Sequence, residues 1–420
     1  MLKKIPIHAL RMGMHLHKME GSWMAHPFWK TRFVIDSTAD LKQLHGCGLA
    51  ECWIDNALGL DVADRVEPDA GSGARARIAA GTPPSPLPSN RAAGAAAQAD
   101  RPMAAELKHA AAICQQGRAA VTAMFNEARM GRTVDAEGCL PLVEEIAQSV
   151  QRNPGAIVSL ARLKTRDDYS YMHSVAVCAL MVALARQTGM DEDDCRAAGL
   201  AGLMHDVGKA VMPLDVLNKP GSLTDNEFAL IRTHPERGHE LLLGGQAVLD
   251  STLDVVLHHH ERMDGTGYPH RLPGDQISLM ARMSAVCDVY DAISSNRPYK
   301  AGWDPAQSIA RMASWKGHFD PVLFSGFVQS LGIYPTGSLV KLESGRLAVV
   351  VEQNAGKLVA PVLMVFFSTQ LQLHITPVRL DLSKPGTQDR ITGREEGGTA
   401  RFPHLDELWA DPDVLRRMKP

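Results

Sequence analysis

The sequence predicts a mainly α protein, in which an all-helical central domain follows a small β-containing N-terminal domain and precedes a short β extension. Three observations predict this arrangement. Residues 103–332 are rich in Ala, Leu and Met at helical spacing, with Gly and Pro between the helical segments. Before them, residues 30–36 alternate apolar and polar side chains. After them, residues 337–353 and 360–367 contain β-branched runs separated by turns.

The composition is that of a globular protein with more than one domain. The chain has 420 residues, whereas a single domain usually has about 100 to 200. It is 45% hydrophobic and 22% charged with a net charge of -3, so nothing indicates a stable nucleic-acid partner. The N-terminus lacks a secretory apolar core, and the most apolar window, 358–367, is about half as long as a membrane-spanning helix. We therefore expect a cytoplasmic protein without a membrane span.

The chain is expected to contain five successive parts. Residues 1–67 mix short alternating segments with turns and predict a small accessory domain with strands. Residues 68–102 are mostly Ala, Pro, Gly and Ser, which bury too little apolar surface to fold, so they predict a flexible Pro/Ala linker. The helical domain follows at 103–332, and a small β extension at 333–383. Residues 384–420 predict a loose polar tail with a helical turn or two near its end.

Candidate metal ligands recur within the helical domain, and they are imidazoles and carboxylates rather than thiolates. The seven cysteines of the chain include no CxxC pair, so neither a zinc ribbon nor a disulfide framework is indicated. A mixed nitrogen and oxygen set suits iron, manganese or zinc in a five- or six-coordinate site. So many ligands exceed what one ion can hold, which favours two ions about 3.5 to 4 Å apart with a bridging carboxylate. In chain order the candidates are His173, His205, Asp206, His234, His258, His259, His260, Asp288 and Asp291.

The stretch HDVGK combines two of these candidates with a cation. On a helix, adjacent His205 and Asp206 point about 100° apart, so one can serve a single ion while the other spans two. We expect Asp206 to bridge the ions. Lys209 returns to the same face three residues later, where its ammonium can stabilise charge on a phosphoryl group. Farther along, NRPYK supplies Arg297 and Lys300. The guanidinium can donate two parallel hydrogen bonds to phosphate oxygens, and the ammonium offers them a compact positive charge.

The stretch HHHERMDGTGYP, residues 258–269, joins three histidines to a glycine-rich turn. The glycines allow a tight loop with positive φ that can project Tyr268 over the site. Pro269 then restricts how the chain leaves the loop. We expect Tyr268 to contact the ligand or to shape access to it.

These motifs resemble the HD-GYP domain, a branch of the HD metal-dependent phosphohydrolases associated with hydrolysis of cyclic di-GMP. DDYSYMHS, HDVGK, KPGSLTDNEFALIRTHPERG, HHERMDGTGYP and AVCDVYDAISSNRPYK resemble five successive motifs of that family. The resemblance covers about residues 134–331. Residues 5–16 and 21–29 resemble an uncharacterised N-terminal domain that often precedes HD-GYP domains. Residues 333–354 resemble the short β extension that commonly follows them.

The resemblance implies an all-helical HD-type domain with a dinuclear metal site, in which His258 is a bystander. It implies iron or manganese, with zinc or nickel as alternatives. Asp206 and Lys209 are the expected catalytic residues. The implied metal ligands are His173, His205, Asp206, His234, His259, His260 and Asp288, and the expected substrate contacts are Lys209, Tyr268, Arg297 and Lys300.

One position departs from part of the family. Some HD-GYP domains carry a glutamate one helical turn before the first histidine, where it helps to hold a third ion, and here that position is Tyr169. A phenol with a pKa of about 10 is a poor ligand at neutral pH, so we expect two ions. Asp167 and Asp168 stay open as alternative ligands.

The expected activity is hydrolysis of cyclic di-GMP to linear pGpG by a metal-bridging hydroxide, with onward conversion to GMP left open. Two alternatives stay open. One is a non-catalytic signalling module that binds cyclic di-GMP, or a diguanylate cyclase domain through the Gly-Tyr-Pro loop. The other is an HD hydrolase of a different nucleotide, because no residue identifies a base pocket. The sequence also leaves the oligomeric state open, with a homodimer as one alternative.

Overall fold

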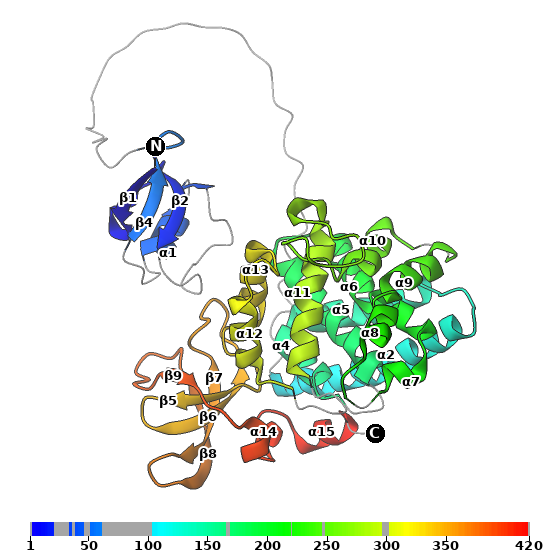
Figure 1. Ribbon diagram of the computed structural model, residues 1–420. Coiled ribbons are helices and arrows are strands. Elements are labelled where there is room, and N and C mark those ends of the chain that lie inside the picture. The colour runs from blue at the N-terminus through cyan, green and yellow to red at the C-terminus, as the bar shows by residue number, and fades with distance from the viewer. Residues whose placement is uncertain are drawn as a thin grey trace, which may run out of the picture. The chain divides into compact units, whose positions relative to one another are not determined.

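The structure is a computed structural model. It describes residues 2–20, 33–35, 38–45, 51–60, 103–164, 169–219, 221–245, 248–295 and 302–418. The chain divides into two compact units, Met1–Ala99 and Asp100–Pro420 (Figure 1). Several sequence predictions lie outside the described residues: the linker at 68–102, the phosphate contacts Arg297 and Lys300, and the alternative ligands Asp167 and Asp168.

The first unit contains a four-stranded antiparallel sheet in the order β1-β4-β2-β3. Its elements are β1 (Leu2–Pro6), η1 (Ile7–Ala9), β2 (His15–Glu20), β3 (Phe33–Val34), α1 (Thr38–His45) and β4 (Glu51–Asp55). In β4, Cys52 and Ile54 are buried while the residues between and beside them are more exposed, as the two-residue period of a strand requires. Together with Leu16 and Leu44 they form a small apolar core.

The helical part of the second unit confirms the predicted mainly α fold. Its elements before the HDVGK stretch are α2 (Met103–Arg129), η3 (Glu137–Cys139), α3 (Leu140–Arg152), α4 (Pro154–Ala161), α5 (Tyr169–Gln187) and α6 (Glu192–Met204). Those after it are η4 (Val207–Val211), α7 (Leu214–Leu217), α8 (Asp225–Ile231), α9 (His234–Leu243), α10 (Asp250–His258), η5 (Gly274–Gln276), α11 (Leu279–Ser294), α12 (Pro305–Ser314) and α13 (Pro321–Leu331).

Helix α5 is the centre of the helical domain. Every residue from Met172 to Ala185 is buried, so the helix has no solvent-facing side over this stretch. It contacts α2, α3, α4, α6, α11 and α13. Four of these neighbours, α4, α6, α11 and α13, begin at N-termini capped by a side chain. In α6, Asp191 accepts a hydrogen bond from the backbone of Asp194, and in α11 Ser278 accepts one from Ala281. Helices α6 and α11 therefore hold the candidate ligands His205 and Asp288 close to α5.

A five-stranded antiparallel sheet follows, in the order β8-β7-β6-β5-β9. Its strands are β5 (Leu339–Leu342), β6 (Arg346–Glu352), β7 (Val362–Ser368), β8 (Leu373–Asp381) and β9 (Ile391–Arg394). One face of β6 adds Leu347 and Val349 to the core of the helical domain, and the other adds Ala348 and Val350 to a separate core within the sheet. The β extension is therefore a sheet packed on both faces.

The C-terminal tail is ordered rather than loose, although the helical turns predicted near its end are present. Residues 391–394 form the edge strand β9, and α14 (Gly398–Arg401), η6 (Leu405–Leu408) and α15 (Pro412–Met418) follow it. Phe402, Trp409 and Met418 are buried in the same core as the helices, and α15 contacts α2. Figure 1 shows these last helices in red, continuing from the orange sheet. The tail orders because its few apolar side chains are spaced so that successive turns bury them.

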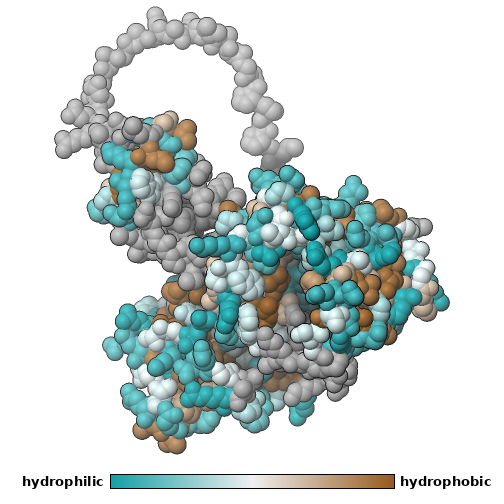
Figure 2. Space-filling model, in the orientation of Figure 1, coloured by the Kyte–Doolittle hydropathy of each residue, from teal (hydrophilic) through white to brown (hydrophobic). Residues whose placement is uncertain are grey.

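The described helices include none that is both long enough and apolar enough to cross a bilayer. On the face that Figure 2 draws, hydrophobic residues form scattered patches among hydrophilic ones. All six described cysteines, Cys52, Cys114, Cys139, Cys178, Cys195 and Cys287, are buried and form no disulfide.

Candidate metal centre

Five helical segments bring the seven predicted ligands to one place. His173 lies on α5, His205 and Asp206 join α6 to η4, and His234 is the first residue of α9. His259 and His260 directly follow α10, and Asp288 lies on α11. Two sets of possible ligand atoms lie within 4.8 Å of one another: those of Asp206, His234, His259 and His260, and those of His173, His205 and Asp206.

Asp206 belongs to both sets, and its two carboxylate oxygens face different partners. Oδ1 lies 3.2 Å from Nε2 of His234 and 3.7 Å from Nε2 of His259. Oδ2 lies 3.3 Å from Nε2 of His205 and 3.5 Å from Nε2 of His173. A carboxylate in this position can contribute one oxygen to each of two neighbouring cations.

Asp288 closes the site from α11. Its Oδ1 lies 3.0 Å from Nε2 of His173 and 4.0 Å from Nε2 of His205, and its Oδ2 lies 3.6 Å from Nδ1 of His260. Its Oδ1 therefore reaches the set of His173, His205 and Asp206, and its Oδ2 reaches the edge of the other set at His260.

The local conformation at His205 and Asp206 differs from the helix that the sequence suggested. Helix α6 ends at Met204, His205 is its C-cap, and Asp206 has φ -102° and ψ 9° before the 3-10 turn η4 begins. The two side chains thus diverge at a junction between two helix types rather than within one helix. Lys209 lies three residues on, which is one turn of a 3-10 helix, and its Nζ lies 2.6 Å from Oδ2 of Asp206.

Hydrogen bonds donated by Nδ1 determine the tautomer of four histidines. Nδ1 of His205 faces the carbonyl of Gly202 at 2.8 Å, and Nδ1 of His234 faces that of Ile231 at 2.7 Å. Nδ1 of His259 faces the carbonyl of Val256 at 3.0 Å, and Nδ1 of His173 faces a carboxylate oxygen at 2.6 Å. Since carbonyl and carboxylate oxygens only accept, each Nδ1 donates its hydrogen and each Nε2 presents a lone pair to the site.

These lone pairs face one another and favour a cation between them. The Nε2 atoms of His173 and His205 are 3.3 Å apart, and those of His234 and His259 are 3.2 Å apart. Two acceptors at this distance repel unless a positive charge lies between them. Oδ1 of Asp206 is buried and accepts no hydrogen bond from a described residue. Nitrogen and carboxylate donors without a thiolate match the ligand preference of first-row divalent ions, so the site can hold divalent metal.

The charges of the site support the same conclusion. Burial raises the pKa of the Asp206 carboxyl, but Lys209 and His205 outweigh this and hold the pKa well below its usual range. Burial lowers the pKa of His259 and His234, and lowers that of His260 to about 3. The acid is therefore ionised and these three imidazoles are neutral near neutral pH, which is the protonation state that metal ligands need.

A buried ion pair contacts His173 at Nδ1, the nitrogen that faces away from the other predicted ligands. Oδ2 of Asp291, the acceptor for Nδ1 of His173, also contacts Nζ of Lys164, and both side chains of this ion pair are almost inaccessible to solvent. Oδ1 of Asp291 accepts a hydrogen bond from Ser295 at 3.0 Å. A carboxylate on the far nitrogen of a ligating histidine orients the ring and increases its basicity.

The Gly-Tyr-Pro loop lies against His260. The ring of Tyr268 packs on the imidazole of His260, with centroids 4.7 Å apart, and the guanidinium carbon of Arg232 lies 4.5 Å from the centroid of the same phenol. Gly267 has no room for a Cβ atom, which would lie 2.5 Å from the backbone of Glu261. The loop is thus pressed against the turn that carries the ligand.

Glu261 binds the backbone that directly follows this loop. Its buried carboxylate accepts hydrogen bonds from the backbone N–H groups of His270, at 2.7 Å, and Leu272, at 3.1 Å. His258 lies outside both ligand sets, because its Nδ1 faces Asp254 at 2.7 Å and its Nε2 faces His270 at 3.0 Å.

Sequence reasoning missed four residues that support the site: Lys164, Glu261, Arg232 and, as the partner of His173 rather than a ligand, Asp291. Asp291 had a detectable signal, since it follows Asp288 by three residues and so shares its helix face. Lys164 had none, because it meets Asp291 across 127 residues of chain. Tyr169 begins α5 four residues before His173, as predicted.

Comparisons with known proteins were consistent with this geometry. A family model described as an HD domain matches residues 144–323, and one described as a domain of unknown function, DUF3391, matches residues 2–139. The chain is 50% identical over 410 residues to a cyclic di-GMP phosphodiesterase of Pseudomonas aeruginosa, which covers 97% of this chain and 96% of that protein.

Two further relatives match a smaller share of the chain. A cyclic di-GMP phosphodiesterase response regulator of Xanthomonas campestris is 43% identical over 140 residues, which is 33% of this chain and 37% of that protein. A 3'3'-cGAMP-specific phosphodiesterase of Vibrio cholerae is 33% identical over 169 residues, which is 40% of this chain and 32% of that protein.

Proposed function

The chain belongs to the HD-domain family of cyclic di-GMP phosphodiesterases, and we propose that it hydrolyses cyclic di-GMP to linear pGpG at a site that holds two divalent ions. One observation supports this most strongly. Four Nε2 atoms and both oxygens of Asp206 gather in one buried space, where divalent cations would bind between the facing donor atoms. An intact donor set of this kind argues against a module that binds the dinucleotide without turning it over.

The donor sets suggest how the ions would be shared. Asp206 would contribute to both, with Asp288 joining His173 and His205 at one ion. His234, His259 and His260 would hold the other. When bound, divalent ions lower the pKa of a water ligand and neutralise phosphate oxygens, which is the chemistry that phosphodiester hydrolysis needs. The mixed nitrogen and oxygen set favours iron or manganese, with zinc or nickel as alternatives.

The other residues of the chain would position and neutralise the substrate. Lys209 holds its ammonium at Oδ2 of Asp206 and is 24% exposed, so it can also meet a phosphate oxygen beside that carboxylate. Tyr268, with Arg232 on its outer face, covers His260 and narrows the approach to the site. Arg297 and Lys300 stay proposed phosphate contacts on sequence grounds.

A second candidate substrate is another cyclic dinucleotide. A relative that matches 40% of the chain is named as specific for 3'3'-cGAMP, and none of the proposed site residues reads a base. The relative that matches nearly the whole chain favours cyclic di-GMP. A diguanylate cyclase domain at the Gly-Tyr-Pro loop, a homodimer and further hydrolysis to GMP stay predictions from the sequence.

The proposal is tested by product identification combined with metal analysis. Protein purified without oxygen is incubated with cyclic di-GMP or 3'3'-cGAMP, and products are separated by chromatography. We expect pGpG from cyclic di-GMP, a slower reaction with 3'3'-cGAMP, and about two ions per chain. Binding of cyclic di-GMP without any product from metal-loaded protein would contradict the proposed activity.

A further inference from the structure

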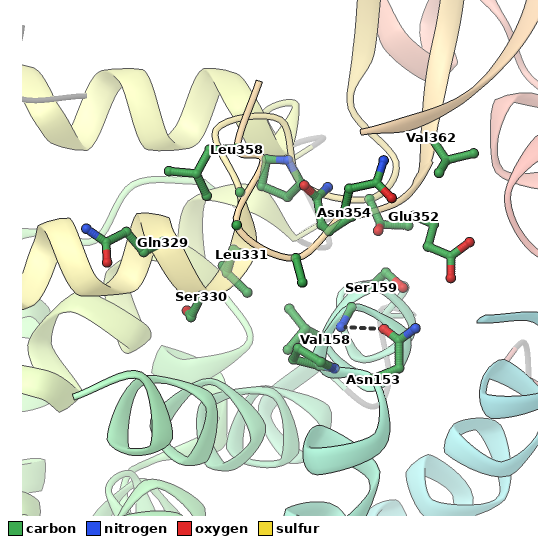
Figure 3. A pocket seen from close by; sticks show the side chains of 18 of the residues that line it. Asn153, Val158, Ser159, Gln329, Ser330, Leu331, Glu352, Asn354, Leu358 and Val362 are labelled. Atoms are coloured by element: carbon green, nitrogen blue, oxygen red, sulfur yellow. Dashed lines mark hydrogen bonds between the residues drawn. The ribbon is translucent and has the colours of Figure 1, made fainter. Parts of the chain in front are cut away.

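A cavity of about 940 Å³ lies between the helical domain and the C-terminal sheet, and none of its lining residues is a candidate metal ligand. Figure 3 shows its walls: Asn153, Val158 and Ser159 at α4, Leu331 at the end of α13, and Leu358 in the loop between β6 and β7. All of these segments belong to the second compact unit. The cavity is large enough for a nucleotide, since ligand sites usually measure about 300 to 1,000 Å³.

Basic side chains outnumber acidic ones around this cavity. The basic ones are Arg152, Arg162, Arg379 and Lys384, and the acidic ones are Glu352 and Asp381. Arg152 is neutralised by Glu106, which lies behind it, and Arg379 pairs with Glu352. The guanidinium of Arg162 makes no hydrogen bond or ion pair with a described residue, although the buried carboxylate of Asp304 acts on it through space. The guanidinium of Arg162 is therefore available to an anion.

Uncharged groups of the wall suit the rest of a nucleotide. Thr336 is only 5% exposed, and its hydroxyl has no hydrogen-bond partner among the described residues. Gln329 accepts a hydrogen bond from Gln187 through Oε1, which leaves its amide N–H groups for other acceptors. Val158 and Leu331 give the wall apolar patches that can cover a ring. The guanidinium of Arg162 therefore suits a phosphate, the uncharged hydrogen-bonding groups suit a sugar, and the apolar patches suit a base.

We propose that this cavity is a second ligand site, for a phosphorylated ligand of nucleotide size whose phosphate is bound by Arg162. Residues that line the cavity are close in the chain to residues that support the candidate metal centre. Arg162 lies two residues before Lys164, and Tyr290, which also lines the cavity, directly precedes Asp291. Lys164 and Asp291 are the pair that orients His173. A ligand that orders the end of α4 therefore acts on the residues that hold a metal ligand, and by linkage metal occupancy changes the affinity of the cavity.

The test is equilibrium dialysis of the full-length protein, with metal removed to prevent turnover, against radiolabelled cyclic di-GMP, pGpG, GMP and GTP. At least one nucleotide should show a binding component that Arg162→Gln weakens by about tenfold or more, the usual effect of losing a charged hydrogen bond. Lys209→Ala should leave this component unchanged, because Lys209 belongs to the metal centre. Arg390→Ala removes an exposed cation directly before β9, one that pairs with Glu343, and is the matched control.

Two further measurements keep the result decisive. Thermal unfolding without ligand must show that Arg162→Gln is folded, and Thr336→Val, which keeps the side-chain shape, should weaken the same component. The proposal is overturned if no nucleotide shows a component sensitive to Arg162→Gln in folded protein. It is also overturned if inorganic phosphate competes as strongly as every nucleotide, because the cavity would then recognise neither sugar nor base.

Discussion

Nδ1 of His173 lies 2.6 Å from Oδ2 of Asp291, and this contact joins residues 118 positions apart in the chain. The contact makes His173 donate from Nδ1, so its Nε2 faces the other ligands. Burial alone would raise the pKa of Asp291, but Lys164 and His173 outweigh it and the pKa is lowered. Lys164 therefore keeps the carboxylate charged in a place that water does not reach.

Replacing Lys164 tests this relationship. Lys164→Met keeps most of the side-chain volume but leaves Asp291 buried without its cation, so Asp291 should hold His173 less well. We expect metal affinity to fall by about 10- to 100-fold, the usual effect of losing such a supporting contact. Isothermal titration with manganese measures it. Lys108→Met, at an exposed position of α2, is the control, and equal affinities in the two variants would show that the pair is not needed.

Asp206 and Lys209 should give different results although their side chains touch. Asp206→Ala removes an oxygen from each ligand set, so both metal content and hydrolysis should be lost. Lys209→Ala should keep the metal and lose rate by about 10² to 10³, because it removes one electrostatic stabiliser. Elemental analysis and initial rates separate the two effects. His258→Ala, beside the ligands but bound to Asp254, should keep its metal. Loss of metal in Lys209→Ala would make Lys209 a structural residue.

Tyr169 should limit the site to two ions. It begins α5 one turn before His173, and a neutral phenol offers little to a third cation. Tyr169→Glu adds a carboxylate there and should raise the stoichiometry from about two toward three ions per chain. Elemental analysis of both proteins, prepared identically, measures this. Three ions in the unaltered protein would implicate another ligand, with Asp167 or Asp168 the first to replace.

The phenol ring of Tyr268 should matter more than its hydroxyl. The ring packs on His260, and the guanidinium of Arg232 lies over the same ring. No described residue forms a hydrogen bond with the hydroxyl. Tyr268→Ala should raise KM by about tenfold with metal content unchanged, because an aromatic contact contributes about 0.5–1.5 kcal/mol beyond area burial. Tyr268→Phe should behave almost like the parent enzyme. A large loss of kcat in Tyr268→Phe would instead assign the hydroxyl a direct part in catalysis.

The two ends of the chain should respond differently to truncation. A fragment of residues 103–418 keeps every helix that carries a ligand together with the C-terminal sheet, so it should fold and bind metal. A fragment of residues 103–397 loses Phe402, Trp409 and Met418 from the core, and burying large side chains of this kind contributes about 1.5–3 kcal/mol each. We expect a clearly lower Tm for the shorter fragment. Equal Tm values would mean that the tail packs without stabilising the fold.

Much of the site could be predicted from the sequence because its information is local. Ligand type, order and spacing lie in short motifs, and a histidine or aspartate brings the same donor atoms to any fold. Helical periodicity likewise predicted the mainly α domain that carries them. The sequence did not reveal that α6 ends at Met204, because the change from α- to 3-10 helix after it depends on packing against α9 rather than on residue preference.

By itself, the sequence determined which residues are candidate metal ligands and that the part of the chain that carries them is helical. Only the tertiary structure decided which oxygen of Asp206 faces which histidine, and that Lys164 reaches Asp291, because such contacts join positions too distant for any local pattern. The tail shows the same limit. Its average composition is polar, so it looked loose, but burial depends on where Phe402 and Trp409 meet the core, and only the folded chain brings these surfaces together.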